Sequence, residues 1–437
     1  MKRLDTAQPD FRAAFARLLD DREGDTARVD APVAEILAAV RARGDEALCA
    51  YTARFDRMPV TPDRLRITEA EIEAACARVP PDLLAALDVA ATRIEAFHRA
   101  QMPADLRYTD ADGVDLGMRW TALDAVGLYV PGGTAAYPSS VLMNAMPARV
   151  AGAARLAMCV PTPDGVLNPL VLAAARRAGV TEIYRVGGAQ AVAAMAYGTA
   201  TIRPVDRVVG PGNAYVAEAK RQVFGRVGID SIAGPSEVVV VADSGTDPRI
   251  VALDLLAQAE HDALAQSILI TQDATLADRV AEAVEAELRT LPRAAIAGAS
   301  WGAHGAIITV RDLDEAASLI DAIAPEHLEL LLADPEPLFA RVRHAGAIFL
   351  GRQCAEAIGD YVGGPNHVLP TSRTARFASG LSVFDFLKRT TFIGAGPDAL
   401  RRIGPAAVAL ARAEGLDAHA LSVSARLDAV ARESDKA

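Results

Sequence analysis

The chain has 437 residues, more than one hydrophobic core usually accommodates, so we expect two or three domains. Apolar residues make up 51% of the sequence and charged residues 23%, which is typical of a globular protein. Because 56 Asp and Glu outnumber 45 Lys and Arg, the net charge is -11, and this balance argues against a protein whose main partner is nucleic acid.

Residues 1–123 are predicted to form a mainly helical segment that packs partly on the second of two α/β units. Apolar residues recur at helical spacing over 33–40. Thr68 and Glu71 have the spacing of a capping box, in which each side chain satisfies a free backbone N–H of the other residue. The run 82–102 contains no Gly or Pro and predicts one long helix.

From residue 124 short apolar runs alternate with alanine-rich helical patterns. The expected strands are Val126–Val130, Leu156–Val160, Glu182–Val186, Arg207–Val209, Val238–Val241, Ile268–Thr271, Ile307–Val310 and Ala347–Leu350. The expected helices are Pro169–Arg177, Gln190–Tyr197, Ala214–Phe224, Ile250–Leu264, Leu276–Leu288 and Leu313–Ile323. This alternation predicts an α/β fold with parallel sheets and right-handed crossovers.

We assign residues 124–236 and 237–375 to two successive α/β units, each with its own sheet. Beyond residue 360 the pattern is irregular and then ends in helical segments expected near 379–389, 398–413 and 418–431. We therefore interpret residues 376–437 as a helical tail rather than as part of a third sheet.

Four glycine-containing turns stand at the ends of expected strands: Pro131-Gly132-Gly133, Gly187-Gly188, Gly210-Pro211-Gly212-Asn213 and Gly234-Pro235-Ser236. Ligands bind at the carboxyl ends of parallel strands, and glycine lets backbone N–H groups approach a phosphate. Glycine also permits tight turns that bind nothing. Four such turns favour a ligand-binding edge, but no G-x-G-x-x-G motif is present, so spacing alone does not identify a nicotinamide cofactor.

Candidate metal ligands occur without any cysteine cluster. Gln258 and His261 are three residues apart on one face of an expected helix, so both side chains can point at one ion. Asp360 and His419 could add a carboxylate and a second imidazole. Mixed nitrogen and oxygen ligands suit a catalytic ion with open positions. Each residue alone is more commonly solvated, and nothing in the spacing joins 258, 360 and 419.

Glu326 and His327 are adjacent and form an acid–base candidate. A carboxylate beside an imidazole can handle two proton transfers of different pKa. Such pairs also occur by chance on exposed surfaces. His98, His304 and His344 are interpreted as structural, whereas His367 lies close in sequence to Asp360 and could join its site.

Six strings in order resemble the histidinol dehydrogenase family, and the resemblance spans about residues 33–426. The strings are VGLYVPGG at 126–133, GPGN at 210–213, QAEH at 258–261, PEHL at 325–328, GPNHVLP at 364–370 and EGL at 414–416. No departure stands at a position that this family uses for chemistry. The resemblance implies two incomplete Rossmann-like units, distantly similar to aldehyde dehydrogenases.

The resemblance also implies a site and its ligands. One Zn²⁺ per subunit would be held by Gln258, His261, Asp360 and His419, with His419 reaching the neighbouring subunit of a homodimer. Ser236, Glu326, His327 and Glu414 would contribute further substrate contacts beside the metal ligands. NAD would contact Tyr129, Gln190 and Asn213.

The implied reaction is the oxidation of L-histidinol to L-histidine through histidinal, in the last steps of histidine biosynthesis. Loss of four electrons requires two hydride transfers to two NAD molecules. His327 is the expected base and Glu326 the group that takes a proton from the hydrating water, while zinc orients the substrate.

Several alternatives stay open at this stage. A relative could oxidise another small alcohol, a non-catalytic relative could serve as a scaffold, and Mn, Co or Fe would accept the same ligands as zinc. An aldehyde dehydrogenase mechanism would need a cysteine nucleophile. Cys159 and Cys354 have no neighbouring base in sequence, and the family pattern assigns them no role.

The four cysteines and the N-terminus bear on the compartment. The cysteines, at positions 49, 76, 159 and 354, form no C-x-x-C pair, which favours a reducing compartment. The first residues are charged and show no signal peptide, and no stretch approaches ~20 apolar residues. We therefore expect a cytoplasmic protein without a membrane span.

Overall fold

The computed structural model describes residues 1–20, 29–132 and 137–434. The chain forms two compact units, each built from separate segments. The first unit comprises Met1–Gln101 and Leu123–Phe386, and the second comprises Met102–Ala122 and Leu387–Ala437. The expected division at 124, 237 and 376 follows the sheets rather than these units, and it stays a prediction.

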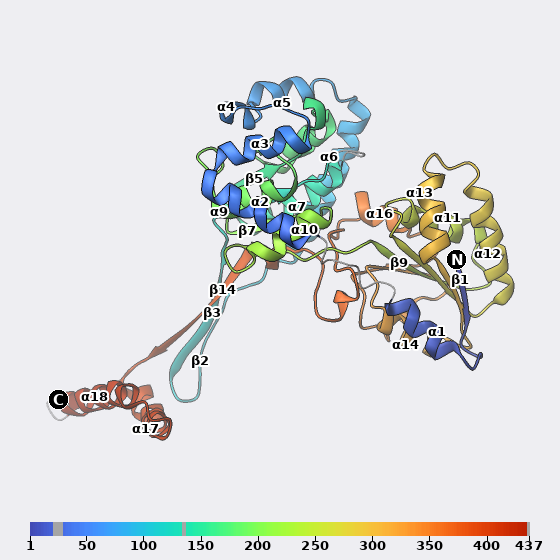
Figure 1. The fold of residues 1–437 in the computed structure, drawn as a ribbon. Helices are drawn as coiled ribbons and strands as arrows, with labels where there is room; N and C mark the ends of the chain where they lie inside the picture. Colours follow the sequence, from blue (N-terminus) through green and yellow to red (C-terminus); the bar gives the residue numbers. More distant parts are fainter. Residues whose placement is uncertain (21–28, 133–136, 435–437) are drawn as a thin grey trace. The chain divides into compact units, whose positions relative to one another are not determined.

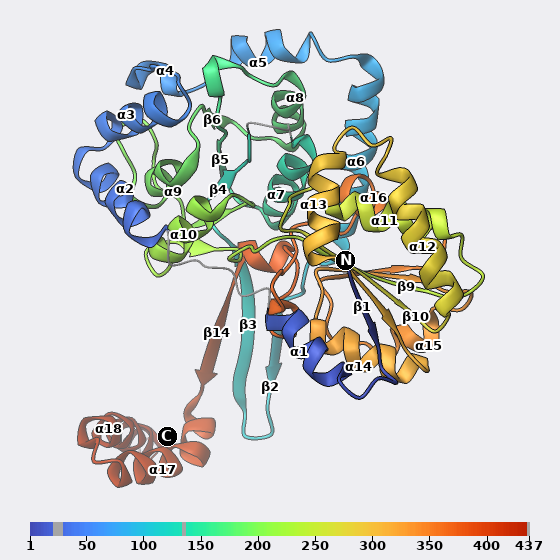
Figure 2. The same ribbon diagram turned by 45° about the vertical axis from the view of Figure 1, so that its right-hand side comes forward.

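The first unit contains a five-stranded parallel sheet with the order β6-β5-β4-β7-β8 (Figure 2). Its strands are β4 (Ala125–Tyr129), β5 (Arg155–Cys159), β6 (Glu182–Tyr184), β7 (Arg207–Val209) and β8 (Gly228–Ile229). The chain order reverses between β4 and β7. In open α/β sheets this reversal creates a crevice at the carboxyl ends of the strands, where ligands bind.

Helices cover both faces of this sheet. One layer consists of α5 (Glu69–Cys76), α6 (Pro81–Ala100), α7 (Pro138–Ala151) and α8 (Pro169–Ala178). The other consists of α2 (Asp30–Arg43), α3 (Asp45–Phe55), α9 (Gly188–Tyr197) and α10 (Ala214–Val223), with the short α4 (Pro62–Leu65) nearby. The long helix expected at 82–102 is α6. The predicted capping box is confirmed, because Thr68 Oγ1 accepts from Glu71 N and Thr68 N donates to the Glu71 carboxylate.

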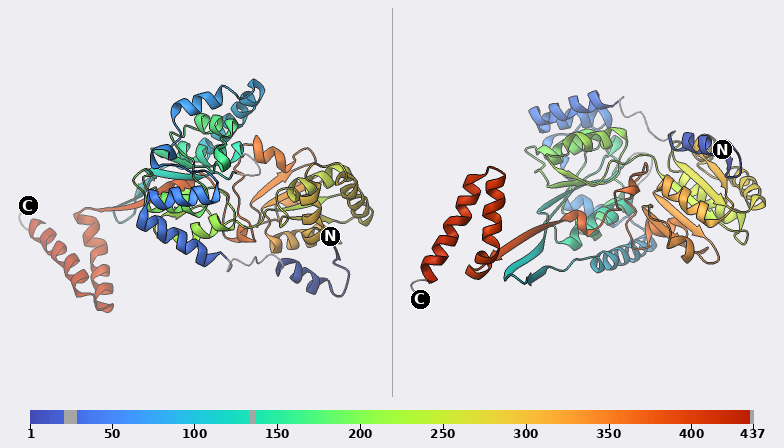
Figure 3. Two further views of the ribbon diagram at one scale, coloured as in Figure 1. Left: turned by 45° about the horizontal axis from the view of Figure 1, so that its top comes forward. Right: turned by 90° about the horizontal axis from the view of Figure 1, so that it is seen from below.

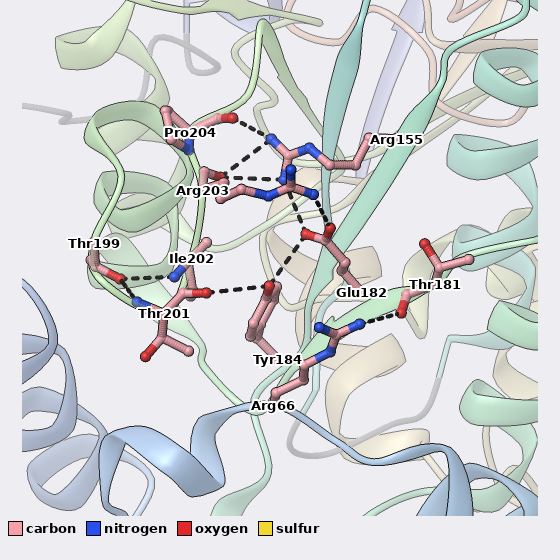
Figure 4. A network of polar contacts seen from close by, with 10 residues as sticks. All are labelled: Arg66, Arg155, Thr181, Glu182, Tyr184, Thr199, Thr201, Ile202, Arg203 and Pro204. Atoms are coloured by element: carbon pink, nitrogen blue, oxygen red, sulfur yellow. Dashed lines mark hydrogen bonds and ion pairs between the residues drawn. The ribbon is translucent and has the colours of Figure 1, made fainter.

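A polar network ties the β5–β6 edge of this sheet to the loop before β7 (Figure 4). The Glu182 carboxylate accepts hydrogen bonds from Arg155 (3.0 Å), Arg203 (2.6 Å) and the Tyr184 hydroxyl (3.2 Å). Although burial opposes it, hydrogen bonding to the two guanidinium groups lowers the pKa of Glu182. The carboxylate is satisfied by neighbouring side chains, so we assign this network a structural role.

The first unit also contains a six-stranded parallel sheet with the order β1-β11-β10-β9-β12-β13 (Figure 1). Its strands are β1 (Lys2–Asp5), β9 (Glu237–Ala242), β10 (Gln266–Thr271), β11 (Ala306–Thr309), β12 (His327–Leu331) and β13 (Ala347–Leu350). Here the chain order reverses between β9 and β12. All six residues of β9 are buried, as expected for a central strand covered on both faces.

Two helical layers again enclose the sheet. One face is covered by α11 (Pro248–Ala259), α12 (Ala274–Glu287) and α13 (Ala294–His304), and the other by α1 (Phe11–Asp20), α14 (Leu313–Ile323) and α15 (Glu336–Phe339). The short helix α16 (Glu356–Tyr361) follows β13, and 3-10 turns form at Pro163–Gly165, Thr374–Arg376 and Val383–Phe386. The predicted α/β class with parallel sheets is therefore confirmed.

The second unit holds a third sheet that the sequence did not predict. In it β3 (Val114–Ala122) pairs antiparallel with β2 (Leu106–Thr109) and with β14 (Leu387–Ala395). The helix expected near 379–389 is wrong, because a 3-10 turn and the start of β14 occupy these residues. The tail then forms a helical hairpin of α17 (Pro397–Ala413) and α18 (Asp417–Ser434), seen in Figure 3. In the described part of the chain, no helix is both long and apolar enough to cross a membrane.

Candidate active site

The acid–base pair lies at the amino ends of two central strands. His327 begins β12 and is paired with Val238 of β9. Glu326 precedes it, and Glu326 Oε2 accepts a hydrogen bond of 3.0 Å from the backbone N of Glu237. Both side chains are buried, with 7% and 4% exposure, so the candidates are not chance residues on an exposed surface.

The surroundings of His327 fix its protonation state. Burial lowers the pKa of His327 to about 4, so the imidazole is neutral near pH 7. Nδ1 lies 3.1 Å from the carbonyl oxygen of Glu237, which can only accept, so we assign the proton to Nδ1. Nε2 then carries the lone pair, and this buried atom has no hydrogen-bond partner among the described residues. A neutral imidazole with a free Nε2 can accept a proton.

Gln258 and His261 lie side by side, although the helix that carries them is shorter than predicted. Helix α11 ends at Ala259, not near Leu264, and the turn that follows is closed by a hydrogen bond from His261 N to the Gln258 carbonyl (3.2 Å). The buried Gln258 amide lies between two imidazoles, with Oε1 accepting from His327 Nδ1 (3.1 Å) and its other amide atom 3.2 Å from His261 Nδ1.

Asp360, near the end of α16, faces the same cluster. Ligand atoms of His327, Glu356 and Asp360 all lie within 4.8 Å of one another. His367 Nδ1 lies 3.6 Å from Asp360 Oδ1. Burial works against ionisation of Asp360, but the hydrogen bond from His367 and the nearby imidazoles, including His261, lower its pKa. The structure thus brings Gln258, His261 and Asp360 to one place.

The loop that follows Asp360 is anchored to helices of the five-stranded sheet. Asn366 Nδ2 donates to the carbonyl of Met143 in α7 (2.6 Å), and its Oδ1 accepts from Val368 N (2.9 Å). From α6, Arg93 donates to the carbonyls of Val362 (2.5 Å) and Gly363 (3.2 Å). The GPNH string therefore has a structural explanation, since Asn366 fixes the segment that carries His367.

Glu356 is a site residue that the sequence did not indicate. Its side chain is 4% exposed and lies 3.5 Å from His327 Nδ1. Burial and the neighbouring carboxylates, Asp360 first among them, raise the pKa of Glu356 well above its usual value. Only its three-dimensional position, beside His327 and Gln258, marks it as part of the site.

The three residues predicted to contact NAD lie at the carboxyl edge of the five-stranded sheet. Tyr129 ends β4, and its hydroxyl accepts from Gly188 N (3.2 Å) at the start of α9. Gln190 is 1% exposed, and neither of its amide atoms has a hydrogen-bond partner among the described residues. Asn213 caps α10 by accepting from two backbone N–H groups. All three stand near the chain reversal between β4 and β7.

The glycine turn after β7 is closely packed and clamped. Gly210 has φ +119°, and a Cβ there would lie 2.0 Å from the carbonyl oxygen of Tyr129. The buried Lys220 donates to the Gly210 carbonyl (3.0 Å), and Asp230 accepts from Gly210 N (2.7 Å). Lys220 and Asp230 also form an ion pair. Packing therefore explains Gly210 without a ligand. Gly133, in the first of the four glycine turns, lies outside the described residues.

We expect Gly210→Ala to lower the free energy of unfolding by about 1–3 kcal/mol, because the residue must stay at positive φ while its Cβ meets the Tyr129 carbonyl. Urea denaturation measures this change. The control is Gly225→Ala, which also has positive φ (+96°) but no atom within 4 Å of the added Cβ. Equal losses in the two variants would contradict the role of the close approach.

The remaining predicted residues lie elsewhere. Ser236 directly precedes β9 and is half-buried. Glu414 and His419 belong to the second unit, at the turn between α17 and α18, and are exposed there. Burial raises the pKa of the Cys159 thiol to about 12, so it is a poor nucleophile.

Comparisons with known proteins extend over almost the whole chain. The family model described as histidinol dehydrogenase matches residues 19–427. Histidinol dehydrogenase from Gluconobacter oxydans is 72% identical over 98% of this chain and all of the relative, and that from Rhodospirillum rubrum is 65% identical over 98% of both. The crystal structure of histidinol dehydrogenase from Elizabethkingia anophelis superposes with a TM-score of 0.94 at 35% identity, covering 98% of each chain.

The chain belongs to the histidinol dehydrogenase family. It is therefore an oxidoreductase, and the prediction of an enzyme is confirmed. The resemblance noted in the six sequence strings is confirmed as well. The side chains that hold metal, substrate and cofactor are proposed from the geometry above.

The residues of this histidinol dehydrogenase family member fit a divalent metal ion. Gln258, His261 and Asp360 offer oxygen and nitrogen but no thiolate, a donor set that suits a catalytic ion. The Gln258 amide lies 3.2 Å from His261 Nδ1, so a donor atom from each residue would be near enough to bond one ion. The residues at the carboxyl edge of the five-stranded sheet fit a polar ligand, because the buried amide of Gln190 has no hydrogen-bond partner among the described residues.

Proposed function

We propose that this protein oxidises L-histidinol to L-histidine through histidinal, in the last steps of histidine biosynthesis, with two NAD molecules as acceptors. The observation that carries the proposal is the buried pair Glu326–His327, whose His327 Nε2 is free while Nδ1 is held by the Glu237 carbonyl. The donor groups of Gln258, His261 and Asp360 beside it support a metal-dependent reaction.

His327 acts as the base in both oxidations. Its Nε2 takes the proton of the substrate hydroxyl while hydride leaves the carbon. Because the Nδ1–H to Glu237 bond fixes the ring, Nε2 keeps its orientation through both steps. NAD bound near Tyr129, Gln190 and Asn213 supplies the hydride acceptor.

Glu326 serves the step between the two oxidations. The aldehyde must be hydrated before it can lose a second hydride, so a water must lose a proton as it attacks the carbonyl. The Glu326 carboxylate is the group proposed to take that proton, and the backbone N of Glu237 orients it. His327 then removes the proton of the hydrated aldehyde.

The metal ligands proposed are Gln258, His261, Asp360 and His419, with Ser236 and Glu414 as further substrate contacts. Zinc bound there would orient the substrate rather than generate a nucleophile. Glu414 and His419 are proposed to complete the site of a neighbouring subunit in a homodimer, which accords with their exposure in the second unit. The four free cysteines accord with the proposed cytoplasmic location.

The test combines elemental analysis with product stoichiometry. We expect one zinc per chain, two NADH formed for each L-histidinol consumed, and histidine as the product. Removal of the metal with a chelator should abolish turnover, and adding zinc back should restore it. NADH formation from another small alcohol, with none from histidinol, would assign the protein to a different substrate.

A further inference from the structure

A pair of carboxyl groups lies behind the acid–base site. Glu329 stands two residues after His327 on β12, and its side chain is fully buried. Asp254 stands four residues before Gln258 on α11, one helical turn away. The two carboxyl groups face each other and interact directly through their side chains. Neither residue was indicated by the sequence, and neither belongs to the site described above.

This pair must share a proton. Ionised carboxylates only accept hydrogen bonds, so one of the two has to be protonated for a hydrogen bond to form between them. Asp254 Oδ2 and Glu329 Oε2 are buried, and no donor from the described ranges reaches either oxygen, so a proton held between the two carboxyl groups would satisfy both. Glu356 of α16 also faces the pair with its carboxyl group, and Asp360 and Glu326 in turn face Glu356. Burial, reinforced by the Asp254 charge, raises the pKa of Glu329 well above its usual value, and burial raises that of Asp254.

The pair also reaches a third element. Glu329 Oε1 accepts a hydrogen bond of 2.7 Å from the backbone N of Glu356, the first residue of α16. Asp360 lies four residues further along this helix. The Asp254–Glu329–Glu356 chain of contacts therefore joins α11, β12 and α16, which carry Gln258, His327 and Asp360.

We propose that Asp254 and Glu329 are positioning residues whose shared proton holds α11, β12 and α16 together, so that Gln258 and Asp360 face one metal ion beside His327. The ligand roles in this statement rest on the proposed function. A carboxyl pair that served only the stability of the fold would change the unfolding temperature when altered, but it would not selectively weaken metal binding.

The variants distinguish loss of the Glu329 contacts to Asp254 and Glu356 from loss of the proton that Glu329 shares with Asp254. Glu329→Gln keeps an oxygen for Glu356 N and supplies a permanent N–H to Asp254, so it should bind metal within about 3-fold of the wild type. Glu329→Leu removes both contacts, and we expect metal affinity and kcat to fall about 10- to 100-fold. Asp254→Ala, at a half-buried position, should show the same direction of change and serves if Glu329→Leu does not fold.

The measurements are the zinc dissociation constant by chelator competition, kcat and KM for histidinol, and the unfolding midpoint of the full chain. The matched control is Glu182→Gln, a buried carboxylate in the other sheet, which should lower the unfolding midpoint and leave zinc affinity unchanged. Chelator competition does not depend on turnover. If the wild type failed to oxidise histidinol, the proposed function would fail while the positioning role was still tested.

The unfolding midpoint should also respond to pH in a defined direction. Folding raises the pKa of both carboxyl groups, so the protonated pair contributes to the free energy of unfolding. This contribution is complete below the usual carboxyl range and is lost as the pH rises through the raised pKa values. Glu329→Gln should therefore lose less stability than the wild type as the pH rises above the usual carboxyl range. Two results would overturn the proposal. One is a metal affinity equal to that of the wild type in both Glu329→Leu and Asp254→Ala. The other is a metal affinity of Glu329→Gln that is as low as that of Glu329→Leu.

Discussion

His327→Asn is expected to lower kcat for L-histidinol by about 10²- to 10⁴-fold, because it removes Nε2, a buried imidazole nitrogen that has no hydrogen-bond partner among the described residues. Asn retains polarity and some hydrogen bonding at the position but cannot accept the substrate proton. The predicted ligands Gln258, His261 and Asp360 are unchanged, so zinc content should stay near one per chain. Steady-state NADH formation together with elemental analysis measures both quantities.

Glu326→Gln should give a different pattern from His327→Asn. The amide keeps an oxygen for the backbone N of Glu237 but cannot take a proton from water. Oxidation of added histidinal should therefore slow more than the first oxidation of histidinol. His344→Asn, at a histidine whose backbone N donates to Asp321, is the matched control and should keep the full rate. Full activity in both site variants would refute the roles assigned to them.

Lys220→Met is expected to lower the free energy of unfolding by about 3–5 kcal/mol, because it leaves the Asp230 carboxylate buried without its cation. The two side chains are only 2% and 4% exposed. Loss of Lys220 also removes the donor to the Gly210 carbonyl, so the turn that leads to Asn213 loses one of its two clamps. The KM for NAD should rise as a second consequence.

Urea denaturation measures the loss of stability, and a double variant measures how far it depends on the pairing of Lys220 with Asp230. Lys220→Met combined with Asp230→Asn removes both charges and should be less destabilised than the sum of the single variants. Removal of the exposed pair Arg43–Glu46 is the control and should cost at most about 0.5 kcal/mol. A Lys220→Met protein as stable as the wild type would show that the buried pair does not hold the turn.

The alternation of parallel strands and helices could be predicted because local pattern and tertiary role agree there. Strand β7 has the predicted bounds, and β4, β5 and β10 lie close to theirs. Strand β12 was not predicted because its sequence, His-Leu-Glu-Leu-Leu, contains a buried acid, and the pairing with β9 overrides its polarity. Strand β1 is short and charged, so only its pairing with β11 marks it as a strand.

Strand β14 of the third sheet could not be predicted because its partner β3 is far away in sequence. In β14, Lys388 and Arg389 favour a helix locally, but the segment pairs with β3 along its whole length. Distance in sequence also hides the contact that explains one of the glycine turns. The close approach of Gly210 to Tyr129 is a tertiary contact, so the sequence left ligand binding and tight packing as equal explanations.

Part of the site could be predicted because its residues are neighbours in the chain. Glu326 and His327 are adjacent in the chain, and Gln258 and His261 are three apart, a spacing that places both side chains on one face of a helix or turn. Asp360 joined them only through the family resemblance. The buried acids Asp254, Glu329 and Glu356 could not be found, because burial of a carboxyl group is a property of the folded chain alone.

The antiparallel sheet of the second unit has a consequence for synthesis on the ribosome. Its central strand β3 is complete by residue 122, but β14, which covers one of its edges, is not made until residue 395. During the intervening translation, that edge exposes unpaired backbone donors and acceptors that can recruit another strand. A chain cut before residue 387 would keep both parallel sheets and expose this edge permanently, so we expect it to aggregate rather than yield a smaller enzyme.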